Sequence, residues 1–259
     1  MITAGIDMGA KNIKVVILKD GVILGKAAVA TGFEQVESAA RCLQTAVEKC
    51  GLELSAIEHI TSTGAGRKAV PDVNSDITEV GADAKGVVHL IPEARTVIDV
   101  GAEEGRGLRI SAEGKVVDFA VNEKCAAGAG SFTEAMSRAL EISIEEFGQL
   151  SLQSTRAIPM NAQCTVFAES EVVSLLHAQT PKEDIAHAVH DAIASRIASM
   201  VRRVGIEQKV VLIGGVAYNP GFVDSLRRAL DSDVIVPQDP EYVGALGAAV
   251  VAGERSANN

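Results

Sequence analysis

Two cysteines stand in segments whose composition suits metal or redox chemistry. Cys125 precedes a run of small residues, 126–130, which is followed by an amphipathic stretch at 131–141. Small residues let the backbone turn sharply and leave the first N–H groups of a following helix free to attract anions. A thiolate beside such amides has a lowered pKa and is a good metal ligand. Alternatively, Cys125 packs as a small apolar residue in a tight loop. This segment alone leaves both interpretations open.

The second cysteine of this kind, Cys164, lies in the segment Asn161–Glu171. Neither cysteine belongs to a Cys-x-x-Cys pair, so local spacing does not make a zinc or cluster site within one chain. A four-thiolate cluster needs four cysteines, and two chains related by a twofold axis can each provide two. The sequence permits that arrangement without indicating it. The other cysteines, Cys42 and Cys50, fall on one face of an expected helix and are interpreted as packing residues.

Two Asp-x-Gly turns follow expected strands, at Asp7–Gly9 and at Asp99–Gly101. This pair of residue types suits a phosphate bound through Mg²⁺, because glycine lets the backbone approach and the carboxylate holds a water of the ion. A single Asp-x-Gly often serves turn geometry alone, but two of them favour a shared function. A later strand at 209–213 runs into Gly214–Gly215, which is either a third ligand turn or a simple strand–helix connection.

Hydrophobic periodicity and turn signals give the element order that must position these turns. Strands are expected over 2–8, 13–18, 22–29, 57–63, 96–100, 108–111, 115–121, 209–213 and 234–236. Helices are expected over 34–50, 81–90, 131–141, 220–230 and 241–252, with a short one capped by Ser143 and Glu146, and a long one from Thr180–Pro181 to about 204. The β-hairpin, strand and helix pattern occurs twice, so two α/β lobes are predicted.

The composition of the chain argues against some classes of function. The chain has 259 residues, 47% of them hydrophobic, and a formal net charge of −10, which argues against general nucleic-acid binding. No apolar run is long enough to span a bilayer, no signal peptide is recognised, and four cysteines fit a reducing compartment. We expect a cytoplasmic protein that binds neither nucleic acid nor membrane. Three histidines, His177, His187 and His190, fall at polar helical positions and are expected at the surface.

The layout resembles the actin, Hsp70 and sugar-kinase (ribonuclease H-like) nucleotide-binding fold. Its first lobe would be 1–93 with 241–259, and its second lobe 94–240. More specifically, Asn122-Glu-Lys-Cys125-Ala-Ala-Gly-Ala-Gly-Ser-Phe132 and Cys164-Thr-Val-Phe-Ala-Glu-Ser-Glu171 resemble the BadF/BadG/BcrA/BcrD ATPase family. That family contains activators of 2-hydroxyacyl-CoA dehydratases and the ATP-hydrolysing subunits of benzoyl-CoA reductase. The resemblance covers nearly the whole chain.

The resemblance implies a [4Fe–4S] cluster held between two subunits by the cysteines that match Cys125 and Cys164. It also implies ATP or ADP with Mg²⁺, and a partner subunit that is either a second copy or a related chain. Electrons would come from ferredoxin or flavodoxin and pass to the catalytic subunits of an acyl-CoA reductase or dehydratase.

The resemblance also assigns residues to the nucleotide, in four groups. The first phosphate turn would be Asp7, Gly9, Ala10, Lys11 and Lys14, and the second Asp99, Gly101, Ala102, Glu103 and Glu104, with Asp7, Asp99, Glu103 and Glu104 as the catalytic carboxylates. Gly128 and Gly130 belong to the cysteine loop, and Glu134 would reach the ribose. Gly214, Gly215 and Asn219 would flank the adenosine.

Two departures from the family pattern decide between its members. Dehydratase activators usually carry hydroxyls where Ala10 and Lys11 stand, and Gly-Gln-Asp where Ala102-Glu103-Glu104 stands. On that basis we expect a benzoyl-CoA reductase subunit, in a heterodimer, with a homodimeric dehydratase activator as the alternative. A sugar or acetate kinase of the same fold would have no use for paired cysteines, and a regulatory subunit would bind ATP without cycling.

Overall fold

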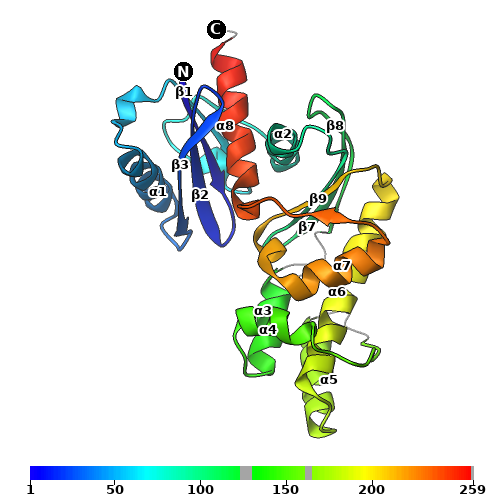
Figure 1. Ribbon diagram of the computed structural model, residues 1–259. Helices are drawn as coiled ribbons and strands as arrows, with labels where there is room; N and C mark the ends of the chain where they lie inside the picture. Colours follow the sequence, from blue (N-terminus) through cyan, green and yellow to red (C-terminus); the bar gives the residue numbers. More distant parts are fainter. Residues whose placement is uncertain (123–129, 161–164, 258–259) are drawn as a thin grey trace. The chain divides into compact units, whose positions relative to one another are not determined.

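The computed structural model describes residues 1–122, 130–160 and 165–257 (Figure 1). The chain forms two compact units. The first comprises Met1–Ala94, Ile110–Val117 and Glu241–Asn259, and the second comprises Arg95–Arg109 and Asp118–Pro240. Each unit contains a five-stranded sheet, and the two units are described separately.

The first sheet has the order β3-β2-β1-β4-β5. Its strands are β1 (Ile2–Met8), β2 (Asn12–Lys19), β3 (Val22–Ala30), β4 (His59–Thr63) and β5 (Ser75–Asp76). The central strand β1 pairs antiparallel with β2 and parallel with β4. Asp20 and Gly21 both have positive φ, at 51° and 80°, which gives the β2–β3 hairpin the turn geometry that matches strand twist.

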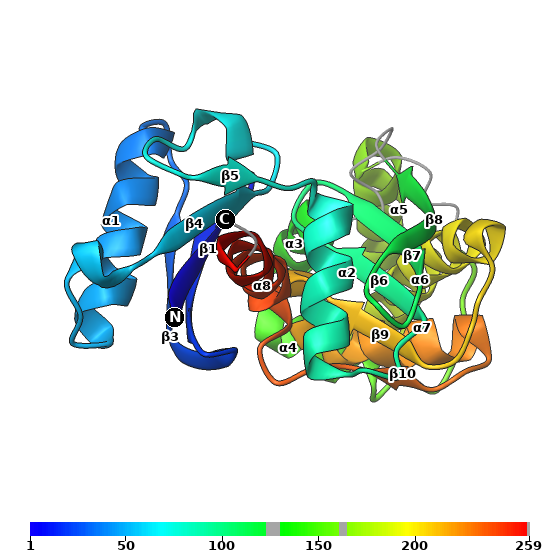
Figure 2. The same ribbon diagram turned by 90° about the horizontal axis from the view of Figure 1, so that it is seen from above.

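The α-helices of the first unit are α1 (Gln35–Lys49), α2 (Glu79–Leu90) and α8 (Val243–Ser256), of which α1 and α8 pack on the sheet and α2 packs on α8. The side chains of α1 pack on β2 and β3, where Cys42 and Ala46 are fully buried. On the other side, α8 lies between β1 and α2 (Figure 2). Helix and strand approach closely at Gly5, where a Cβ would stand only 2.0 Å from the Ala245 carbonyl oxygen. Glycine at this position therefore sets how deeply α8 sits on the sheet.

The second sheet has the order β10-β9-β6-β7-β8. Its strands are β6 (Thr96–Val100), β7 (Gly105–Ile110), β8 (Val116–Asn122), β9 (Val210–Ile213) and β10 (Val234–Ile235). The fully buried β6 pairs antiparallel with β7 and parallel with β9. The connectivity around β6 thus repeats the connectivity around β1.

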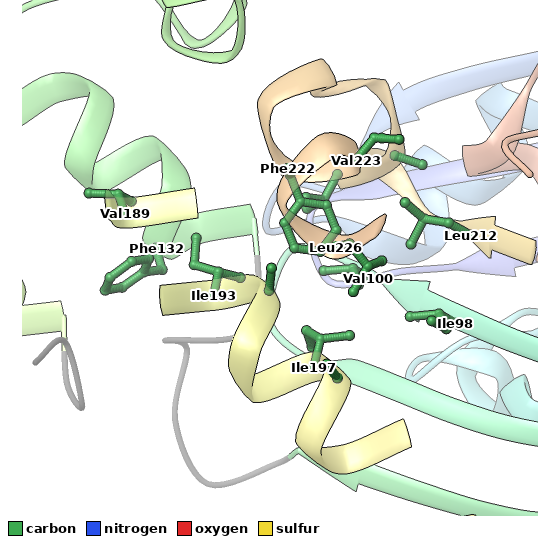
Figure 3. Packing of buried hydrophobic residues seen from close by; sticks show 14 of the residues in the cluster. Ile98, Val100, Phe132, Val189, Ile193, Ile197, Leu212, Phe222, Val223 and Leu226 are labelled. Carbon is green, nitrogen blue, oxygen red and sulfur yellow. The ribbon is translucent and has the colours of Figure 1, made fainter. Parts of the chain in front are cut away.

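The helices of the second unit are α3 (Gly130–Ala139), α4 (Ile144–Ser151), α5 (Thr165–His177), α6 (Lys182–Val204) and α7 (Pro220–Leu230). The long helix α6 packs against both α4 and α7. Figure 3 shows the core between α6, α7 and the sheet, built from Ile193, Phe222, Leu226 and neighbouring side chains. The expected capping box of α4 is confirmed, because Ser143 and Glu146 bond each other's backbone N–H groups.

Three sequence-based expectations need correction. Helix α5 was not expected. Pro181 is the N-cap of α6, which begins at Lys182, and is not the first helical residue. His190 is fully buried and not at the surface, because α6 is covered by α4 and α7 on the side that carries it.

None of the described helices has the length and apolar composition needed to cross a bilayer.

Candidate nucleotide site and cysteine segments

The central strand of the first unit ends in a carboxylate that is braced by a lysine. Asp7 of β1 is directly opposite Lys14 of β2 on one side and Thr63 of β4 on the other. Lys14 Nζ donates a hydrogen bond to Asp7 Oδ2 at 3.1 Å, and both side chains are more than four-fifths buried. Because cross-strand neighbours project from the same face, strand register alone brings this cation to the carboxylate.

The second unit repeats the arrangement with an arginine. Asp99 of β6 is opposite Arg106 of β7 and Ile213 of β9. Arg106 Nη1 donates to Asp99 Oδ2 at 2.6 Å, and its Nη2 lies 3.2 Å from Glu104 Oε1. In both units the cation follows the aspartate by seven residues. Sequence reasoning missed Arg106, although the equal Asp-to-cation spacing could have found it.

A glycine with positive φ closes each arrangement. Gly64 follows β4 with φ 90°, and Gly214 follows β9 with φ 88°. A Cβ on Gly64 would lie 2.6 Å from Asp7 Oδ1, and one on Gly214 would lie 2.5 Å from Asp99 Oδ1. Both the backbone conformation and the close approach therefore require glycine. Gly64 is not among the site residues predicted from the sequence.

The first turn, residues 9–11, is tied to the end of β3. Thr31 Oγ1 donates to the Gly9 carbonyl at 2.8 Å, and the Thr31 N–H donates to the Lys11 carbonyl at 2.9 Å. Ala10 and Lys11 are exposed at the tip of the turn. These contacts hold the turn through its carbonyls, which leaves its tip accessible to solvent.

The second turn, residues 101–104, supports the start of α3. The Gly101 N–H donates to the Glu104 carbonyl at 3.0 Å and closes the turn. The Gly101 and Ala102 carbonyls accept from the N–H groups of Gly130 and Ser131, at 2.8 and 2.9 Å. Turn and helix therefore form one rigid piece, with Glu103 exposed on the turn. Glu134 lies one helical turn further along α3 and is partly buried.

The Gly214–Gly215 turn continues as a 3-10 helix, Gly215–Tyr218, that ends at Asn219. The Gly214 N–H donates to the Pro240 carbonyl at 3.0 Å. No atom of the described residues lies within 4 Å of a Cβ placed on Gly215, so the turn is open there. Asn219 is buried instead, where it caps α7 and contacts His190.

Cys125, Gly128 and Cys164 lie outside the described residues. Their flanking helices are described: α3 begins five residues after Cys125, and α5 begins at Thr165, directly after Cys164. These helices pack together, with Phe132 and Met136 of α3 in the same core as Ala168 and Val172 of α5. The described helices that follow the two cysteine motifs therefore belong to one hydrophobic core.

The other two thiols do not suit ligation. Cys42 is fully buried against β2, and burial raises the pKa of its thiol to about 11. Burial also raises the pKa of Cys50, whose Sγ would be 2.3 Å from a Cβ on Gly25. Metal ligation requires the thiolate, which a raised pKa disfavours. The chain therefore offers Cys125 and Cys164 as its candidate ligands.

The two sheets and the duplicated Asp–cation–Gly arrangement define the class of protein. It has an α/β, two-unit, actin-like nucleotide-binding fold, which confirms the expected fold. A solved ROK family glucokinase from Streptomyces griseus matches 98% of this chain and 100% of that chain with a TM-score of 0.61. At 16% identity, this likeness shows the fold alone.

Comparisons with closer proteins identify the family. The model of the BadF/BadG/BcrA/BcrD ATPase family matches residues 4–252, and the chain belongs to this family, as the two cysteine motifs predict. The activator of lactoyl-CoA dehydratase from Anaerotignum propionicum is 41% identical over 98% of both chains. The crystal structure of Acidaminococcus fermentans (R)-2-hydroxyglutaryl-CoA dehydratase component A matches 99% of both chains, with a TM-score of 0.96 and 35% identity. The activator of the 2-hydroxyisocaproyl-CoA dehydratase from Clostridium difficile, solved with bound ADPNP, has a TM-score of 0.94 and 37% identity, and covers 100% of this chain and 96% of that one.

The expectation of a benzoyl-CoA reductase subunit is less well supported than its alternative. A subunit of the benzoyl-CoA reductase from Thauera aromatica is 30% identical, over 96% of this chain and 92% of that protein. The dehydratase activators are more similar over comparable lengths. The expectation of a reductase subunit rests on two altered turns, at residues 10–11 and 102–104, whereas similarity along the whole chain favours the dehydratase activators.

Proposed function

We propose that this chain is an ATP-hydrolysing activator that delivers electrons to a 2-hydroxyacyl-CoA dehydratase. The observation that carries the proposal is full-length similarity, at 35–41% identity, to three proteins named as activators or as the activating ATPase of such dehydratases. The 30% identity to a benzoyl-CoA reductase subunit supports reductase function less well.

In this proposal the two braced aspartates bind the Mg²⁺–phosphate part of ATP. Asp7 and Asp99 each hold a water of the Mg²⁺ shell, because Mg²⁺ usually keeps several of its waters. Lys14 and Arg106 fix the orientation of these carboxylates through Oδ2, at 3.1 and 2.6 Å. Gly9 and Gly101 let the backbone approach the phosphates, and Lys11 at the exposed first tip offsets their charge.

The unusual second turn still presents an acidic side chain. Glu104 is paired with Arg106 at 3.2 Å, while Glu103 is exposed. We assign Glu103 to orient the attacking water, with Glu104 supporting Arg106. Gly214 and the open Gly215 contact the adenosine, and Glu134 reaches the ribose.

We assign Cys125 and Cys164 as two of the four ligands of a [4Fe–4S] cluster, with a second copy of the chain providing the other two. When bound, such a cluster supplies a low-potential one-electron carrier. Ferredoxin or flavodoxin would donate the electron, and the dehydratase component would receive it. A second copy is favoured over a related chain because similarity to the activators outweighs similarity to the reductase subunit.

Purification of the chain alone, without oxygen, tests this assembly. We expect a brown dimer with broad absorbance at about 400 nm and about four irons and four sulfides per two chains. It should hydrolyse ATP in the presence of Mg²⁺. A colourless chain that becomes brown only when produced with a related subunit would instead support the heterodimeric reductase. A monomer with a complete cluster would contradict both assignments.

A further inference from the structure

A fully buried histidine joins three helices of the second unit. The Nδ1 atom of His190, on α6, is 2.8 Å from the Ala186 carbonyl oxygen, and its Nε2 is 3.0 Å from Asn219 Nδ2. Its ring centroid lies 4.5 Å from that of Phe147 on α4. A side chain that contacts α4, α6 and the start of α7 fixes these elements relative to one another.

The contacts of His190 define its protonation. A carbonyl oxygen only accepts, so Nδ1 carries the proton and donates it to Ala186. Nε2 is then an acceptor, and the Asn219 amide donates to it. The amide orientation is fixed independently, because Asn219 Oδ1 accepts from the Phe222 N–H at 3.1 Å. Burial lowers the pKa of His190 to about 4, so the imidazole is neutral at ordinary pH.

Asn219 is the far end of the Gly214–Gly215 turn. Its own N–H donates to the Val216 carbonyl at 2.9 Å, and the side chain has the two contacts described above. Its backbone and its side-chain amide are thus engaged inside the unit. The Gly214 end is fixed by the Pro240 carbonyl at 3.0 Å. The turn is therefore held at both ends, with His190 supporting the end at Asn219.

Asn219 is closely packed against the backbone of α4. A Cβ on Gly148 of α4 would lie 2.6 Å from Asn219 Oδ1, and a Cβ on Gly221 would lie 2.8 Å from the Gly148 carbonyl oxygen. The backbone of α4 thus lies directly against the start of α7. Without His190, the Asn219 amide must either stay buried without its acceptor or move, and movement shifts the turn.

We propose that His190 is a positioning residue for nucleoside binding, acting through Asn219 on the Gly214–Gly215 turn. This inference rests on the proposed function, in which that turn contacts the adenosine. Asn219 then contributes by holding the shape of the turn, since its side chain is engaged within the protein. His190 affects the nucleoside part of ATP and leaves the phosphate turns at Asp7 and Asp99 unchanged.

The test compares His190→Leu with His190→Gln, which restores an acceptor for Asn219. The matched control is His187→Leu, one turn earlier on α6, where the histidine contacts the Ser151 carbonyl at 3.3 Å and Asp191 at 3.3 Å. Dissociation constants for Mg²⁺–ATP and for Mg²⁺–tripolyphosphate, which lacks the nucleoside, are measured on the anaerobically purified assembly. Thermal unfolding checks that each variant is folded.

We expect His190→Leu to weaken ATP binding by about 10-fold or more, with tripolyphosphate changed by less than about twofold. His190→Gln should recover most of the ATP affinity, and His187→Leu should keep it. If His190→Leu does not fold, Asn219→Ser decides, because serine preserves the helix cap but is too short to reach His190. Folded variants that bind ATP like the wild type, or that lose both ligands equally, would overturn the inference. A wild-type protein that binds no ATP would instead refute the proposed function.

Discussion

The two glycines of the Gly214–Gly215 turn differ sharply in what a side chain would meet. At Gly214, φ is 88° and an added Cβ would lie 2.4 Å from the Val100 carbonyl oxygen. With ψ at 171°, this conformation is one that essentially only glycine adopts; forcing alanine into it costs about 1–3 kcal/mol, and relieving the overlap costs about 1–3 kcal/mol more. We therefore expect Gly214→Ala to lower the free energy of unfolding by about 2–6 kcal/mol.

The neighbouring substitution is a matched control. A Cβ on Gly215 would meet nothing within 4 Å among the described residues, so Gly215→Ala should change the free energy of unfolding by less than about 0.5 kcal/mol. If the open space receives the adenosine, the same variant should nevertheless bind ATP more weakly. Urea unfolding of both variants, without nucleotide, measures the stability difference. Equal stabilities for the two variants would refute the reasoning about Gly214.

Three further predictions concern the metal, the nucleotide and acid stability. Cys125→Ser and Cys164→Ser should each abolish iron binding while Cys42→Ala retains it, and full iron content in either serine variant would refute the ligand assignment. Asp7→Asn should weaken Mg²⁺–ATP binding by about 10- to 100-fold in calorimetric titrations, and unchanged affinity would rule out the first phosphate turn. Burial lowers the pKa of His190 to about 4 from its ordinary 6.5. The unfolded chain therefore takes up a proton at His190 at a higher pH than the folded protein does, so the folded state should lose about 3 kcal/mol of stability as the pH falls from 6.5 towards 4. Acid unfolding of the wild type and of His190→Leu measures this loss of stability, and an identical pH dependence of the two proteins would contradict a lowered pKa for His190.

Local sequence patterns predicted the elements whose causes are local. The bounds of β1 were predicted residue for residue, the strands expected over 13–18 and 22–29 form a hairpin, and the capping box at Ser143–Glu146 is present. Hairpins and caps depend on a few neighbouring residues, so a single sequence contains their signals.

Features that depend on how strands pair and helices pack were missed. Arg106 reaches Asp99 only through strand register, and Gly64 meets Asp7 only because β4 lies beside β1. Helix α5 lacks a clear apolar face, with Phe167 and Val173 exposed while Ala168 and Val172 are buried. Periodicity therefore could not reveal it.

The burial of His190 was missed for a related reason. Helix α6 is covered by both α4 and α7, and a polar residue can be buried there because specific partners satisfy it. A polar position in a helical pattern indicates solvent only where one side of the helix is open. The expectation of a reductase subunit is less well supported for a different reason: it rests on two turns, whereas similarity along the whole chain favours the dehydratase activators.

The most direct test of the account is activation of a dehydratase. The anaerobically purified chain is mixed with a 2-hydroxyacyl-CoA dehydratase component, its 2-hydroxyacyl-CoA, a low-potential reductant and Mg²⁺–ATP, and formation of the unsaturated acyl-CoA is measured. We predict product only when ATP and the chain are both present, and none with the Cys125→Ser variant. Dehydration that proceeds equally with that variant or without ATP would contradict the central claim.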